Sequence, residues 1–178
     1  MSYRFVRNLL WFLTIAISPL SPVKAQNTAQ WAVVGNWSIR IGLQPFAQAK
    51  ECFLITSTQD GSLFRLGFAG RGIYISIGNP AWQSVQIGST YALSVKFGDK
   101  SPWAVRAQAI ASADGGKVLL TRFDEQSAFQ ILAQFAEQGN VLVYYKDKLV
   151  ISVPLVESRA AATAMFDCES KFAPPIRN

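Results

Sequence analysis

Two cysteines, Cys52 and Cys168, are the only thiols among the 178 residues, and the chain contains no histidine. The absence of histidine excludes Ser-His and Cys-His catalytic pairs and the usual histidine-containing zinc and copper sites. The thiols lie 116 residues apart, so they do not form a Cys-x-x-Cys pair. They either form one disulfide or remain as two buried free thiols. No cofactor and no metal site is expected from these residues.

Carboxylates are the remaining candidates for catalysis, because a pair of them can hydrolyse a glycosidic bond. Each candidate also fits a plainer interpretation, either as a residue of a turn or as part of the start of a helix. The candidates in predicted turns are Asp60, Asp99 and Asp114. The candidates at the predicted start of a helix are Asp124 and Glu125.

Large aromatic residues and one isolated arginine are the candidates for binding. Trp82 and Trp103 stand where loops lead into strands, and tryptophan is favoured in binding hot spots. Arg71 lies between Gly70 and Gly72, at the tip of a predicted hairpin, where it could contact an anionic partner. The alternatives are that the tryptophans fill the ends of the core, and that Arg71 is a solubilising charge.

The first 25 residues have the three-part pattern of a signal peptide. Two arginines precede an apolar run at 9–17, and small residues at Val23 and Ala25 suit cleavage before Gln26. A membrane anchor is the alternative, but serine and proline interrupt the run before it reaches the length of a bilayer span. Export to an oxidising compartment, the periplasm or the outside of the cell, favours the disulfide. No second long apolar run follows, so stable membrane insertion is not expected after cleavage.

Cleavage removes three basic residues, which lowers the net charge from +6 to +3. The remaining positive residues are spread along the chain with no dense cluster. Nucleic-acid binding is therefore disfavoured, because it usually needs a concentrated basic face.

The periodicity predicts one mainly β domain at 26–178, with two helices. Alternating or apolar runs predict strands, and a change of period to 3.6 predicts the helices. An antiparallel β-sandwich or a strongly bent sheet fits this order, and a closed barrel is the second choice. The strands are expected at 31–41, 51–57, 63–68, 73–77, 91–97, 103–110, 118–123, 141–145 and 149–155, the helices at 124–139 and 157–168, and a loose tail at 171–178.

The two helices are predicted to bury different stripes. The first would bury Phe129, Leu132, Ala133 and Ala136, and the second Ala161, Ala164, Met165 and Cys168. An inward-facing Cys168 would then tie the last helix to the early strand that carries Cys52.

Several residues of this chain, taken together, give it a resemblance to known protein families. The residues that carry the resemblance are Trp82 with Gly88 and Tyr91, Trp103, the helix at 129–135, and the Ala-rich helix ending in Cys168. Together they look like a group of small exported bacterial proteins of unknown function. Gly35-Asn36-Trp37 is similar to the opening of the invasion-associated locus B family, although the cysteine usual there is missing from 38–41. The final helix closing on a cysteine resembles the type VI secretion accessory protein VasI, although its usual Gly-Leu pair before that helix is absent.

The resemblance implies a periplasmic, non-enzymatic binding or accessory role toward a protein or a cell-envelope component. Such a module would engage its partner through an exposed edge strand or an aromatic loop surface. The alternatives are a carboxylate-dependent glycan hydrolase and a carrier of a small apolar ligand.

Overall fold

The computed structural model describes residues 28–47, 49–112 and 116–172. The predicted signal peptide at 1–25, the turn residue Asp114 and the end of the predicted tail lie outside this part of the chain. The described elements are, in chain order, β1 (Ala29–Val34), β2 (Trp37–Leu43), β3 (Lys50–Ser57), β4 (Leu63–Ala69), β5 (Gly72–Gly78), β6 (Thr90–Phe97), β7 (Trp103–Ala111), β8 (Lys117–Phe123), α1 (Glu125–Glu137), β9 (Asn140–Tyr145), β10 (Lys148–Pro154) and α2 (Ser158–Phe172).

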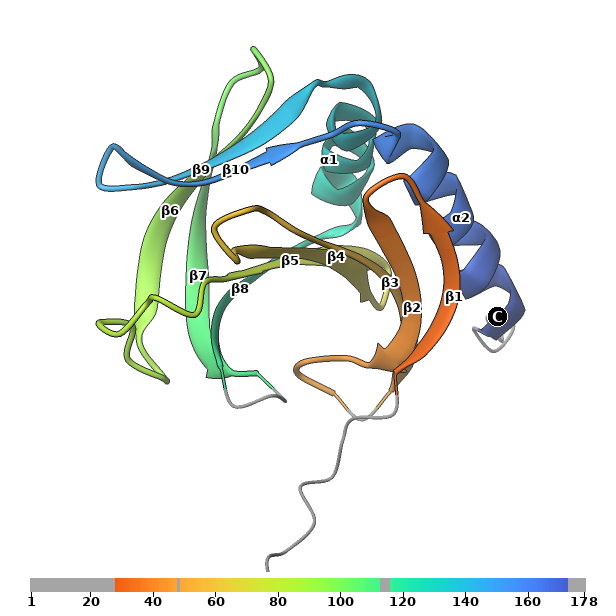
Figure 1. Cartoon of the computed structure of the whole chain (residues 1–178), viewed down its shortest axis with the longest axis horizontal. Coiled ribbons are helices and arrows are strands. Elements are labelled where there is room, and N and C mark those ends of the chain that lie inside the picture. Colours follow the sequence, from red (N-terminus) through yellow and green to blue (C-terminus); the bar gives the residue numbers. More distant parts are fainter. Residues whose placement is uncertain (1–27, 48, 113–115, 173–178) are drawn as a thin grey trace, which may run out of the picture.

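All ten described strands belong to one antiparallel sheet with the order β1-β2-β3-β4-β5-β8-β7-β6-β9-β10. The sheet bends so strongly that β9 and β10 pass over β4 and β5, with the helices at one side (Figure 1). This confirms the predicted mainly β fold with a strongly bent sheet. Within the described residues β1 and β10 end the sheet and do not pair with each other, so it is not a closed barrel.

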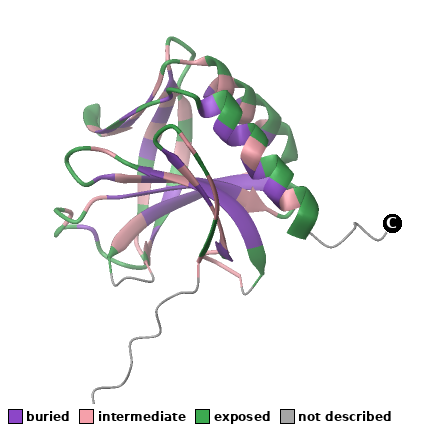
Figure 2. Cartoon of the chain, turned by 45° about the vertical axis from the view of Figure 1, so that its right-hand side comes forward, coloured by how far each residue is buried: buried purple, intermediate pink, exposed green. Residues whose placement is uncertain are grey.

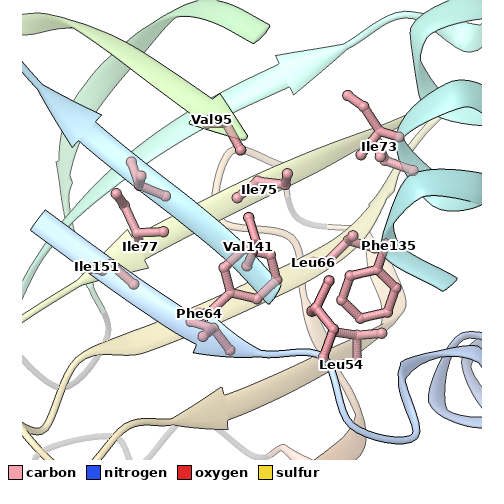
Figure 3. Packing of buried hydrophobic residues seen from close by; sticks show 14 of the residues in the cluster. Leu54, Phe64, Leu66, Ile73, Ile75, Ile77, Val95, Phe135, Val141 and Ile151 are labelled. Carbon is pink, nitrogen blue, oxygen red and sulfur yellow. The ribbon is translucent and has the colours of Figure 1, made fainter. Parts of the chain in front are cut away.

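The hydrophobic core lies on the concave side of the bend. Val141 of β9 and Ile151 of β10 point toward Phe64 and Ile75 of the central strands (Figure 3). Every residue of β5 is buried, because α1 and the core cover one face of that strand while the β2–β3 loop approaches the other. We call these two sides of the sheet the core face and the opposite face.

The predicted strand at 31–41 is two strands, β1 and β2, joined at Gly35-Asn36. Gly35 has a φ of +54°, which favours glycine, and the carboxylate of Glu157 occupies the space where a Cβ would be. Apolar residues on both sides of the turn hid the break in the sequence pattern. Trp37 and Ile39 are buried on the core face, as predicted.

Helix α1 forms where predicted but buries a different stripe. Ala128, Ile131 and Phe135 face the core, whereas Phe129 is 70% exposed and Ala133 is exposed. The predicted stripe is therefore wrong: the buried face of the helix is rotated from it by about one residue, or about 100°. Apolar residues cover a little over half of the circumference of this helix, so its sequence leaves the rotation open within that wide face. The ring of Phe135 sets it, because that ring lies against Trp37, with centroids 5.1 Å apart, and stacks on Phe64.

Helix α2 packs on β1, β2 and β3 through a buried stripe of Ala161, Met165 and Cys168, with Ala164 partly buried beside it. Its inner side is buried and its outer side exposed (Figure 2). The small side chains let the helix approach the sheet closely, as the sequence predicts. The helix continues to Phe172, so Lys171 and Phe172 belong to it and not to a loose tail.

Cys52 and Cys168 form the predicted disulfide, with Cα atoms 5.9 Å apart. The bond joins α2 to β3 across 116 residues of chain. It is reinforced nearby, because the backbone N–H of Cys52 donates to the carboxylate of Glu169 at 2.9 Å.

Candidate functional site

The structure places the three predicted binding residues apart. Arg71 lies in the β4–β5 turn and Trp82 in the loop after β5, so they stand at opposite ends of that strand. Trp103 begins β7, two strands away in the sheet. These residues do not form one continuous surface.

Both tryptophans pack partly against the core. The indole N–H of Trp103 donates to the side-chain oxygen of Gln134 on α1 at 2.9 Å, and its ring meets Phe123 edge-on. Trp103 therefore links the start of β7 to α1, which is the structural role that competes with binding. Trp82 is half-buried in the loop after β5. Its backbone N–H donates a hydrogen bond to the carbonyl of Asn79, which closes a turn in that loop.

Arg71 is highly exposed, with 81% of its side-chain surface accessible. Its guanidinium lies 3.9 Å from the carboxylate of Glu125 at the start of α1. A pair this exposed contributes little to stability, so the charge of Arg71 stays available to solvent.

Three of the described carboxylates proposed for catalysis, Asp60, Asp124 and Glu125, have local partners, and that of Glu125 is Arg71. Asp60 accepts hydrogen bonds from Thr58 and Ser62, and these bonds lower its pKa. Asp124 caps α1 by accepting from the N–H of Ser127 at 2.8 Å, which lowers its pKa in the same way. Asp99 lies in the β6–β7 turn. These contacts are the turn and capping roles that compete with catalysis.

The outer edge of β10 borders a groove, which we call the β10 groove. Residues 149–154 form one wall, and Asn36 with residues 56–60 at the β3–β4 turn forms the other. The enclosed volume is about 620 Å³. Within the described chain no strand pairs with this edge of β10. An unpaired edge presents a row of backbone N–H and C=O groups that can accept another strand.

A buried polar cluster lies on the opposite face of the sheet. The carboxylate of Glu51 accepts hydrogen bonds from the Tyr74 hydroxyl and from the Arg65 guanidinium, both at 2.5 Å. The same nitrogen of Arg65 also donates to the carbonyl of Leu43. The Glu51 side chain has no exposed surface, and Phe46 of the β2–β3 loop packs against the Tyr74 ring.

Burial raises the pKa of Glu51 from 4.5 to about 7, although the hydrogen bond from Tyr74 and the charge of Arg65 oppose this shift. The nearby charge of Glu169 raises the pKa further. Burial also raises the pKa of Tyr74 well above its usual value, so that hydroxyl remains protonated and donates to Glu51. One Glu51 oxygen, Oε2, and Nε of Arg65 are buried without a hydrogen-bond partner among the described residues.

The sequence pattern did not identify this cluster. Glu51 stands at the start of an apolar strand, and Arg65 stands at a polar position of a strand that alternates between apolar and polar residues. Both are positions at which a charged residue is usually exposed. The one available signal was the uniformly apolar run at 52–55, which is typical of a strand covered on both faces, where any charge would be buried. The partners come from three strands, and only the register of β3, β4 and β5 brings them together.

Comparison of the chain with protein-family models, curated proteins and solved structures finds no significant match. The resemblance to the locus B family and to VasI therefore stays a prediction. Among the described residues, no helix is long and apolar enough to cross a membrane. The same part of the chain holds no group of three or more Cys, Asp or Glu residues placed to hold a metal ion.

Proposed function

We propose that this protein is an exported, periplasmic accessory protein of the cell envelope that binds an extended segment of a protein partner without catalysis. The observation that carries the proposal is the free edge of β10 beside the β10 groove. A segment bound there would add an eleventh strand to the sheet, and its main-chain hydrogen bonds would provide affinity.

The walls of the β10 groove suit such a segment. On β10, Ile151 and Val153 are buried toward the core, while Leu149 is 53% exposed. The facing wall is polar, with Ser57 and Asp60 exposed. We expect the bound segment to alternate, with apolar side chains near Leu149 and polar or basic side chains near the Asp60 carboxylate, because successive residues of a strand point to opposite sides.

Export is supported by two independent features. The signal-peptide pattern at 1–25 directs secretion, and the Cys52–Cys168 disulfide fits an oxidising compartment. A periplasmic accessory role also agrees with what the resemblance to exported bacterial proteins implies.

The glycan-hydrolase alternative has less support. The carboxyl with a raised pKa, Glu51, has no exposed side-chain surface through which it could meet a glycan. Its hydrogen-bond partners are Arg65 and Tyr74, and the nearby carboxylate of Glu169 accepts a hydrogen bond from the backbone N–H of Cys52. A glycosidase instead places two carboxyl groups on either side of an accessible scissile bond.

The test is to capture partners from envelope extracts with the oxidised, exported protein and to compare two variants. Gln59→Trp adds bulk at the exposed β3–β4 turn, on the wall of the β10 groove opposite β10, and we expect it to weaken partner binding at least tenfold. Thr163→Trp adds the same bulk on the exposed side of α2 and should leave binding unchanged. Hydrogen–deuterium exchange at residues 149–153 should slow when the purified partner is added.

Two results would contradict the proposal. One is equal partner affinity for Gln59→Trp and the wild type. The other is unchanged exchange of the β10 amides in the complex, since an added strand must protect some of them.

A further inference from the structure

A second hollow lies on the opposite face of the sheet, and the proposed function does not use it. It has a volume of about 320 Å³ and lies over β2, β3, β4, β5 and β8. Its lining includes Arg40, Arg65, Phe53, Ile55 and Val118. We call it the arginine pocket.

The strand register brings the two arginines to one face. Arg40 of β2 pairs with Phe53 of β3, and Arg65 of β4 pairs with Ile55 of β3. Since directly paired residues share a face of the sheet, Arg40 and Arg65 stand on either side of β3. The guanidinium of Arg65 lies 3.6 Å from the centre of the Phe53 ring, which holds it beside the pocket.

Both arginines retain capacity for an anion. Nε of Arg40 donates to the hydroxyl of Ser38, and within the described residues Arg40 has no ion pair. Arg65 donates to Glu51 and to the carbonyl of Leu43 through one terminal nitrogen, and its Nε is buried. Among the described residues its other terminal nitrogen has no hydrogen-bond partner, so that nitrogen is left for an anion. A guanidinium offers five N–H donors in a planar fork that matches oxyanion groups.

The rest of the lining that the structure describes is mainly apolar and contains no carboxylate. Phe53, Ile55 and Val118 provide apolar surface, and Ser76 adds a hydroxyl group. The carboxylate of Glu51 lies behind Arg65 and is not part of the lining. Pockets of this size that are mostly apolar, with a few convergent polar groups, are typical of small-molecule sites.

We propose that the arginine pocket binds a small organic anion, with an oxyanion headgroup on Arg40 and Arg65 and a compact apolar body against Phe53, Ile55 and Val118. The headgroup is a carboxylate or a phosphate monoester, because both match the guanidinium fork. This site is separate from the β10 groove, so it stands or falls independently of the proposed function.

Calorimetric titration of the full, oxidised protein with four probes tests the proposal. Octanoate and octyl phosphate carry both parts of the expected ligand, octanol lacks the charge, and inorganic phosphate lacks the apolar body. We expect saturable binding of octanoate, octyl phosphate or both with a Kd at or below about 1 mM, and binding at least tenfold weaker for octanol and for phosphate. The stronger of the two anions identifies the headgroup class.

Three variants locate the site. Arg40→Gln removes one headgroup contact at a half-exposed position and should weaken binding about tenfold, whereas Arg40→Lys should restore part of it. Arg106→Gln is the matched control, because Arg106 is an exposed arginine of β7 that does not line the pocket. Gln59→Trp, which alters the β10 groove at a position that does not line the arginine pocket, should bind the anion as the wild type does.

The proposal is overturned if neither anion binds at 10 mM, if octanol binds as tightly as octanoate, or if Arg40→Gln and Arg106→Gln have the same affinity as the wild type. Loss of anion binding in Gln59→Trp would also overturn it, because the pocket would then not be a separate site.

Discussion

The hydroxyl of Tyr74 donates a 2.5 Å hydrogen bond to the carboxylate of Glu51, a residue 23 positions earlier, and both groups are buried between the sheet and the β2–β3 loop. Arg65 completes this cluster from the strand between them. A carboxyl closed off from water in this way makes the stability of the fold depend on pH near neutrality.

The first prediction concerns that pH dependence. The pKa of Glu51 is about 7 in the folded protein and about 4.5 when the chain is unfolded, so the folded state keeps a proton that the unfolded state releases between these values. The free energy of unfolding should therefore fall by up to about 3 kcal/mol as the pH rises from 4.5 to 7, and then level off. Urea unfolding at pH 5.5 and pH 8 measures the difference.

Glu51→Gln is the variant that checks this assignment, because it keeps an acceptor for Tyr74 and Arg65 but does not titrate. Its unfolding free energy should be nearly the same at both pH values. Asp60 and Asp124 have lowered pKa values, so their contributions are lost only as the pH falls below about 4, outside this window. If the variant loses as much stability as the wild type between pH 5.5 and pH 8, another group causes the pH dependence.

The second prediction concerns the disulfide. A closed loop of 116 residues corresponds to about 4 to 5 kcal/mol of stabilisation in the chain-entropy treatment. The double variant Cys52→Ala, Cys168→Ala should lose at most that amount, measured by denaturant unfolding. Titration of the denatured, non-reduced wild type should find no reactive thiol, and two thiols per chain would show that the bond does not form.

The third prediction distinguishes the two orientations of α1. Phe135 is fully buried against Trp37 and Phe64, so Phe135→Ala should cost about 3 to 5 kcal/mol of stability. Phe129 is 70% exposed, so Phe129→Ala should cost less than about 1 kcal/mol. Thermal unfolding of both variants measures the contrast, and equal losses would mean that the helix also buries the face predicted from the sequence.

The fourth prediction concerns Trp103, one of the two tryptophans proposed for binding. Trp103→Ala removes the hydrogen bond to Gln134 and the contact with Phe123, so it should destabilise the protein by about 2 to 4 kcal/mol. Trp103→Phe retains most of the ring and should recover part of the loss. If Trp103→Ala abolished partner capture while its unfolding midpoint stayed unchanged, Trp103 would be a binding residue and not a structural one.

The order of strands and helices was readable in the sequence because it depends on local periodicity and turn residues. Lys146 and Asp147, predicted as a turn, both adopt positive φ between β9 and β10. The small residues of α2 indicated which face it buries, because large and polar residues occupy its other sides. The pairing of Cys52 with Cys168 followed because two cysteines allow only one intramolecular connection.

The tertiary structure alone decided which residues meet across the sheet. The apolar face of α1 is wide enough to leave the rotation of the helix open, and the contact of Phe135 with Trp37 fixed it. Glu51, Arg65 and Tyr74 looked like ordinary strand residues, because a single strand does not show what will cover it. The free edge of β10 and the arginine pocket likewise depend on strand order and register, which are set by contacts between residues far apart in the chain.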